Sequence, residues 1–219
     1  MDISVNLGNI SLKNPFMPAS GTFGYGLEYK DFGDLSKLGA IVTKGISLNP
    51  KKGNKPPRIC EVKGGMINSI GLENVGIEAF CDKLKELENI DTVIVCNFFG
   101  NTFDEYISVA EKLNSLKRVD VLEVNISCPN VKEGGICFGT DERMISELIG
   151  ELRKVVNKPL WVKLTPNVSD VSKIAIVSEK SGADAIVVAN TYTAMSVDIT
   201  TRRPKIKNIY GGMSGPAIK

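Results

Sequence analysis

VLEVNISCPNVKEGG, residues 121–135, joins a short apolar run to a loop of small and polar residues. Residues 121–124 predict a buried strand. Pro129 lacks an N–H and biases Cys128 away from helix, so the strand must end there. Gly134-Gly135 marks an irregular loop. A thiol and two amides therefore stand at the end of a strand, where α/β folds usually carry their chemistry. The alternative is an ordinary turn that contains a cysteine.

The overall composition predicts one globular domain over residues 1–219. Hydrophobic residues make up 42% and charged residues 24% of the chain, enough for a full core. The net charge of +2 gives no reason to expect nucleic acid or an anionic membrane as a partner. No apolar run approaches the ~20 residues of a membrane span, and the first residues lack the pattern of a signal peptide. A cytoplasmic location is therefore expected.

The cysteine and histidine counts limit the possible chemistry. The chain has five scattered cysteines, without a C-x-x-C pair, which favours a reducing compartment over disulfides or a metal site: Cys60, Cys81, Cys96, Cys128 and Cys137. It has no histidine, which excludes Ser–His and Cys–His relays and zinc sites built on histidine. A general base must then be Cys, Lys, Tyr, Ser or a carboxylate.

Strand and helix patterns alternate along the chain. After a hairpin at residues 5–12, strands are predicted at 15–19, 40–43, 92–96, 121–126, 160–164 and 185–189. Helices are predicted at 29–38, 74–87, 102–113, 141–155 with Asp141 as its cap, and 169–181. Irregular segments occupy 46–70 and 192–212. Short apolar strands that alternate with helices predict a parallel α/β fold.

Polar residues stand at or just past the end of each predicted strand, namely Ser20, Lys44, Asn97, Asn125, Lys163 and Asn190. The carboxyl ends of the strands meet at one mouth in a (β/α)₈ TIM barrel, whereas an open sheet spreads them along an edge. The barrel is therefore the favoured fold, with six of its eight βα units present. Residues 211–217 predict the start of another helix shortly before Lys219, so a C-terminal truncation is expected.

The residue types at this mouth suggest a ligand. Lys44 and Lys163 beside buried strands suggest an anionic ligand or charge that develops during a reaction, although solvated surface lysines are the alternative. Three asparagines at strand ends suit a planar, amide-rich ligand, or they merely cap the strands. Gly211 to Gly215 form either a plain turn or an anion-binding nest of N–H groups.

Seven segments together resemble a known family, the class 1 dihydroorotate dehydrogenases, in its catalytic subunit. They occur in the family's order and span the chain: PASGT (18–22), TKG (43–45), NSIGL (68–72), NISCPN (125–130), KLTPN (163–167), NT (190–191) and GGMSGPA (211–217). The resemblance implies an FMN-dependent (β/α)₈ barrel that oxidises dihydroorotate to orotate in pyrimidine synthesis. Cys128 matches the cysteine base of class 1.

The segment NISCPNVKEGG most resembles the NAD-linked 1B branch. That branch implies a separate electron-transfer subunit carrying FAD and a 2Fe-2S cluster, and a homodimer of the barrel within a heterotetramer. Three alternatives stay open: the fumarate-dependent class 1A enzyme, a dihydropyrimidine dehydrogenase-like barrel, and a non-catalytic fragment.

The resemblance also implies roles for single residues. Contacts to FMN are expected from Ser20, Lys44, Gly45, Asn97, Asn125, Lys163, Ala189 and Gly215. Contacts to the substrate are expected from Lys44, Asn68, Ser69, Ile70, Gly71, Leu72, Asn125, Asn190 and Thr191, with Cys128 as the base. The chain departs from the family in lacking the glycine-rich loops after the last two strands, where the family holds the flavin phosphate.

Overall fold

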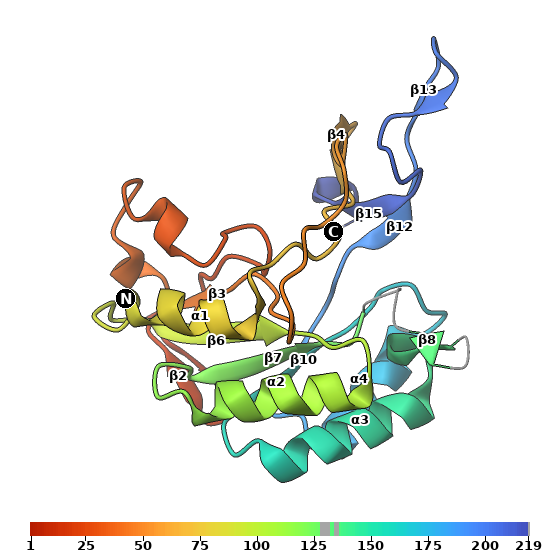
Figure 1. Ribbon diagram of the computed structural model, residues 1–219. Coiled ribbons are helices and arrows are strands. Elements are labelled where there is room, and N and C mark those ends of the chain that lie inside the picture. The colour runs from red at the N-terminus through yellow and green to blue at the C-terminus, as the bar shows by residue number, and fades with distance from the viewer. Residues whose placement is uncertain (128–131, 134–135, 219) are drawn as a thin grey trace.

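The computed structural model describes residues 1–127, 132–133 and 136–218, and its centre is a parallel sheet (Figure 1). Five strands follow the order β11-β10-β7-β6-β3. Their bounds are β3 (Ala40–Val42), β6 (Val93–Phe98), β7 (Val121–Asn125), β10 (Leu160–Lys163) and β11 (Ala185–Val187). Each strand lies beside its predecessor in the chain, without the switch point of a doubly wound sheet. The predicted alternating parallel fold of the barrel class is confirmed.

Four helices pack on the outer face of this sheet. They are α1 (Gly76–Lys85), α2 (Phe103–Ser115), α3 (Glu142–Val155) and α4 (Val171–Lys180), and they share one apolar core with the outward side chains of the strands. Capping fixes where three of them begin, because the side chains of Thr102, Asp141 and Asp170 accept hydrogen bonds from N–H groups of the first turn. The predicted helix starting after Asp141 is confirmed.

The inner face of the sheet is closed at its amino end by the N-terminal hairpin. This hairpin consists of β1 (Val5–Leu7) and β2 (Ile10–Leu12) and confirms the prediction for residues 5–12. Gly8 in its turn has a φ of 58°, a conformation that glycine adopts without strain. Leu12 packs in a second apolar cluster with inward side chains of four strands, Ala40, Val42, Val95, Val121 and Trp161.

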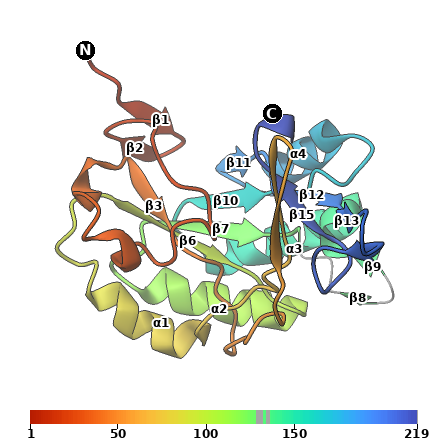
Figure 2. The same cartoon turned by 90° about the horizontal axis from the view of Figure 1, so that it is seen from above.

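A second, antiparallel sheet projects away from α2 and α3 (Figure 1), and Figure 2 shows it end-on beside the carboxyl ends of β7 and β10. We call it the arm; its order is β12-β15-β5-β4. The strands are β4 (Ile59–Val62), β5 (Gly65–Asn68), β12 (Tyr192–Ala194) and β15 (Gly211–Ser214). A short ladder, β13 (Val197–Asp198) with β14 (Arg203–Pro204), extends from it.

The arm corrects three predictions. Residues 46–70 and 192–212 are not wholly irregular, since each contains strands of the arm. Residues 211–217 do not begin an α-helix: β15 pairs on both sides and leads into a 3-10 helix, η4 (Pro216–Ile218). Glycine permits this close pairing, because a Cβ at Gly211 would stand 2.5 Å from the carbonyl oxygen of Asn68.

Two further predictions near the N-terminus are wrong. Residues 15–19 form no strand, because Pro15 and Pro18 have no N–H to donate to a ladder. Residues 29–38 are not one helix: they contain the last residue of one 3-10 turn, η1 (Leu27–Tyr29), and the whole of a second, η2 (Leu35–Lys37). Asp34 separates them, because its carboxylate accepts from Ser36 N and begins a new turn. The described parallel sheet therefore has five strands instead of six.

The segment after β7 contains β8 (Lys132–Glu133), β9 (Ile136–Cys137) and η3 (Phe138–Thr140). Cys128 lies outside the described residues. Among the helices of the described segments, none has the length and apolar character needed to cross a bilayer.

Candidate active site at the carboxyl end of the sheet

The inner face changes from apolar to polar toward the carboxyl ends of the strands. Parallel pairing places Asn97 of β6 opposite Glu123 of β7, and Asn125 of β7 opposite Lys163 of β10. All four side chains are buried. Because burial of unpaired polar groups is costly, so dense a group indicates a site held together by its own contacts.

Glu123 is the centre of this buried group. Its Oε1 accepts from Asn97 Nδ2 at 2.6 Å and lies 3.9 Å from Lys163 Nζ. Burial raises the pKa of the Glu123 carboxyl, and Lys163 and Asn97 oppose the rise. The sequence interpretation missed Glu123. Its signal was a carboxylate at an inward position of the otherwise apolar run 121–124.

Asn125, Ser127 and Asn190 form a second group at the same end. Ser127 donates to Asn125 Oδ1 through its Oγ at 2.6 Å and through its N at 3.2 Å. Asn190 Nδ2 donates to Ser127 Oγ at 2.6 Å, which connects the segment after β11 to the end of β7. Tyr106 of α2 donates to the carbonyl oxygen of Asn125 at 2.9 Å and holds the strand end from the helical side. The structure thus brings together two asparagines that lie 65 residues apart.

Lys44 follows β3 and joins an ion network with the segment that follows the β4–β5 hairpin. Its Nζ lies 3.6 Å from Glu73 Oε1, while Arg58 contacts Glu73 Oε2 at 2.5 Å. Arg58, followed by Lys44, holds the pKa of the Glu73 carboxyl below its usual range. Ser20 Oγ donates to the carbonyl oxygen of Thr43 at 2.9 Å, so the predicted Ser20 also lies at the end of β3.

The predicted substrate segment 68–72 leaves the arm at the end of β5. Asn68 Nδ2 donates to Gly212 O at 3.3 Å, and a Cβ on Gly212 would meet Thr191 Oγ1 at 1.9 Å. Asn68 and Thr191 therefore both lie against Gly212. Ser69, Ile70 and Gly71 pack on the loop at residue 54, where Asn54 N donates to Ile70 O and Asn54 Nδ2 to Ser69 O. Leu72, the last residue of this segment, has a φ of 55°, in the left-handed region that non-glycine residues rarely adopt.

Two predicted cofactor residues lie apart from the buried group. Gly215 directly follows β15 of the arm, and a Cβ there would stand 2.6 Å from the Cα of Gly65, the first residue of β5. Residues 211–214 form a paired strand instead of an anion-binding nest. Ala189 is exposed beyond the end of β11. Cys128, the predicted base, follows Ser127 and lies outside the described residues.

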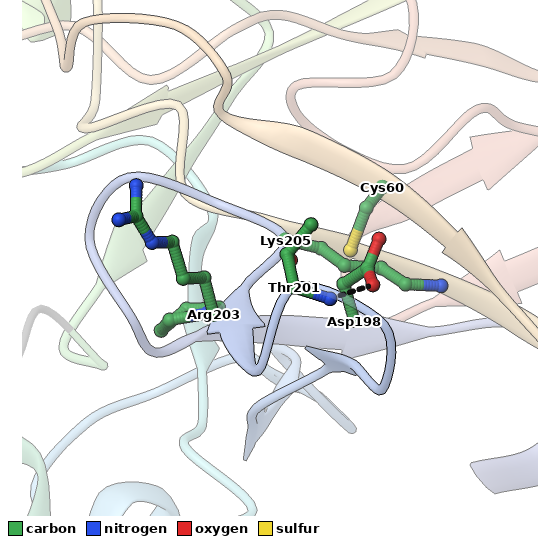
Figure 3. Close-up of a pocket in the computed structure, with 6 residues that line it drawn as sticks. Cys60, Asp198, Thr201, Arg203 and Lys205 are labelled. Carbon is green, nitrogen blue, oxygen red and sulfur yellow. Dashed lines mark hydrogen bonds between the residues drawn. The ribbon is translucent and has the colours of Figure 1, made fainter.

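A pocket of about 720 Å³ on the arm is lined by none of the predicted site residues. Figure 3 shows its lining by Cys60, Asp198, Thr201, Arg203 and Lys205, with Thr201 N donating to Asp198. The lining comes from β4 and the β13–β14 ladder, and no residue of the parallel strands contributes to it. The buried group is therefore a better candidate for chemistry than this open depression.

Comparison with known proteins identifies the family. The dihydroorotate dehydrogenase family model matches residues 2–219. The chain is 55% identical over 219 residues to the "Dihydroorotate dehydrogenase B (NAD(+)), catalytic subunit" of Geotalea daltonii, covering 100% of this chain and 72% of that protein. It is 51% identical over 220 residues to the protein of the same name from Caldicellulosiruptor saccharolyticus, covering 100% of this chain and 73% of that protein.

A solved structure has the same fold. The crystal structure of DHODH in complex with ferulenol from Eimeria tenella matches with a TM-score of 0.77 at 20% identity, covering 98% of this chain and 65% of that one. At this identity the likeness supports the fold alone. The family model and the curated relatives cover essentially the whole sequence, and the chain belongs to the dihydroorotate dehydrogenase family.

Proposed function

We propose that this chain is the FMN-binding catalytic subunit of an NAD-linked dihydroorotate dehydrogenase, which oxidises dihydroorotate to orotate in pyrimidine synthesis. One observation carries the proposal: the buried group of Asn97, Glu123, Asn125 and Lys163 at the carboxyl ends of the strands, in a chain 55% identical to a catalytic subunit of that name. The carboxyl end of the strands is where barrels of this class place their reactions.

The buried group has features that fit a flavin. Asn97 Oδ1 is buried, and no donor within the described residues reaches it. A Cβ at residue 45 would lie 2.8 Å from that oxygen, so only glycine lets the backbone at residue 45 approach the amide this closely. Lys163 supplies a buried positive charge, which suits a ring that gains negative charge on reduction. When bound, FMN would accept the hydride that leaves C6 of dihydroorotate.

The residues of the chain would then divide the remaining work. Ser20, Lys44, Gly45, Asn97, Asn125 and Lys163 would hold the cofactor, and Ala189 and Gly215 stay proposed contacts from the resemblance. Asn68 to Leu72, Asn190 and Thr191, with Lys44 and Asn125, would bind the substrate, whose carbonyl and N–H groups match amide side chains. The thiolate of Cys128 would remove the C5 proton. The Asn125–Ser127–Asn190 hydrogen bonds would anchor the start of its loop.

Replacement of Cys128 tests the chemical assignment. Cys128→Ala should retain FMN and lose turnover by roughly 10²–10⁴-fold, the usual loss for a general base. Cys81→Ala, in helix α1 on the outer face, is the matched control and should keep normal turnover. If Cys128→Ala turns over at the wild-type rate, Cys128 is not the base.

Replacement of Lys163 separates cofactor from substrate binding. Lys163→Ala should weaken FMN retention or make the flavin harder to reduce, while orotate affinity of the remaining holoprotein changes less. Flavin absorbance near ~450 nm measures retention, and an orotate titration measures the second quantity. Normal flavin content and reduction with lost orotate binding would assign Lys163 to the substrate.

Electron-acceptor assays test the subclass. We propose that electrons reach NAD+ through a separate electron-transfer subunit carrying FAD and a 2Fe-2S cluster, with two barrels and two such subunits in a heterotetramer. The name of the relatives, catalytic subunit of an NAD(+) enzyme, supports this assignment. Turnover with fumarate in the absence of any partner would instead indicate class 1A.

A further inference from the structure

Glu123 is a carboxylate in a place where strands normally carry apolar side chains. It is 2% exposed and occupies the middle of β7, between Val121 and Asn125 on the inner face. Burial of a carboxylate raises the free energy of the folded state unless hydrogen bonds and opposite charges offset the loss of hydration. Its polar contacts are the Asn97 amide at 2.6 Å and the Lys163 ammonium at 3.9 Å. No step of the proposed reaction uses Glu123, so its presence calls for another reason.

The contact with Asn97 fixes the orientation of an amide. An ionised carboxylate can only accept hydrogen bonds, whereas an asparagine amide has a donating and an accepting end. Asn97 must therefore turn its Nδ2 toward Glu123 and its Oδ1 away from it. That oxygen lies beside Gly45, is buried, and meets no donor among the described residues. Burial raises the pKa of the Glu123 carboxyl, and the positive charge of Lys163, 3.9 Å from its Oε1, opposes this rise and favours the ionised, accepting form.

We propose that Glu123 is a positioning residue, which orients the Asn97 amide so that its carbonyl oxygen is presented to an N–H group of the flavin ring. The inference rests on the proposed function, since it requires FMN at this end of the sheet. Glu123 itself does not touch the cofactor. It acts through Asn97, and its removal should matter only while Asn97 is present.

A double-mutant cycle tests this coupling. FMN dissociation constants are measured by flavin fluorescence in the full chain for wild type, Glu123→Gln, Asn97→Ala and the double variant. Glutamine keeps the size of Glu123 but can accept or donate, so both orientations of Asn97 become possible. Glu123→Gln should weaken FMN binding about five- to tenfold, as expected for one misplaced hydrogen bond. In the Asn97→Ala background the same change should alter binding less than twofold.

One control variant completes the test, and its outcomes distinguish failure of this inference from failure of the proposed function. Glu111→Gln, on the exposed side of α2, should leave FMN binding unchanged. Equal FMN affinity in Glu123→Gln and wild type, or equal losses in both Asn97 backgrounds, would overturn the inference and leave the proposed function standing. Failure of the wild type to bind FMN would overturn the proposed function and this inference with it. If Glu123→Gln does not fold, Glu123→Asp replaces it, because aspartate keeps the charge but cannot reach Asn97 as closely.

Discussion

The two ends of the inner face use the same strands for different purposes. At the amino end, Val95, Val121 and Trp161 pack with Leu12 in an apolar cluster. Two residues further along the same strands stand Asn97, Glu123 and Lys163. Two residues correspond to roughly 6.6 Å of strand, so one repeat of the pleat separates packing from polar contacts. From this comparison we expect that stability and the proposed ligand binding can be changed separately in this chain.

The strongest test of that separation is Trp161→Ala at the apolar end. Trp161 is 2% exposed, and loss of its ring should lower the free energy of unfolding by about 3–5 kcal/mol. Denaturant unfolding measures this loss. The fraction that stays folded should bind FMN with wild-type affinity. A protein of normal stability with impaired FMN binding would place Trp161 in the site and erase the distinction.

Asn190→Ala tests the polar end of the inner face at the segment that follows β11. It removes the donor to Ser127 and a proposed substrate contact, so orotate affinity should fall about tenfold, equivalent to about 1.4 kcal/mol. Asn114→Ala is the matched control, because Asn114 bonds the backbone of residues 155 and 157 in the outer layer. It should lower stability without changing orotate affinity. The reverse pattern, measured by orotate titration and thermal unfolding, would contradict the assignment.

Asp141→Ala tests a polar residue that follows the carboxyl end of a strand but begins a helix, α3, instead of belonging to the buried group. Asp141 Oδ1 accepts from Arg143 N at 2.9 Å and from Met144 N at 3.0 Å. Loss of this cap should cost about 1 kcal/mol of stability and leave the FMN dissociation constant unaltered. Weaker FMN binding in Asp141→Ala would show that helix α3 and the site are coupled. Asp141→Asn should restore most of the stability.

The smallest predicted effect concerns Cys96, the outward neighbour of Asn97 on β6. Burial raises the pKa of this thiol from 9.0 to about 12. The unfolded chain releases the proton first, so the folded state binds more protons between about pH 9 and 12 and its stability falls as pH rises. At pH 9.5 the loss is about 0.8 kcal/mol relative to pH 7. The stability difference between wild type and Cys96→Ala should shrink by this amount, and a constant difference would contradict the pKa.

Local sequence predicted those parts of the fold that depend on local physics. Strand–helix alternation, the hairpin at 5–12 and the Asp141 cap each have a signal within a few residues. The arm does not, because β15 is glycine-rich and finds its partner, β5, far away in the chain. Residues 15–19 were wrongly predicted as a strand from their apolar composition, because the two prolines prevent regular strand pairing there.

The candidate site was predictable where strand ends carry amides and lysines. Asn97, Asn125 and Lys163 follow from the rule that parallel strands place chemistry at their carboxyl ends. Glu123 was missed because an apolar run was treated as uniform. Alternation along β7 places it on the same face as Asn125. Its partners come from β6 and β10, and only the sheet register brings them together.

The pairing of Asn68 with Gly212 has a consequence for biosynthesis. The two residues are 144 positions apart, and at about 5–20 residues per second a ribosome needs roughly 7–30 s to make the intervening chain. Until then the β4–β5 hairpin has only itself for support, and isolated hairpins are marginally stable in water. Strands β3, β6, β7 and β10 are complete well before residue 212 is made. The proposed substrate segment 68–72 is therefore fixed late in synthesis, after the strands that supply the buried polar group.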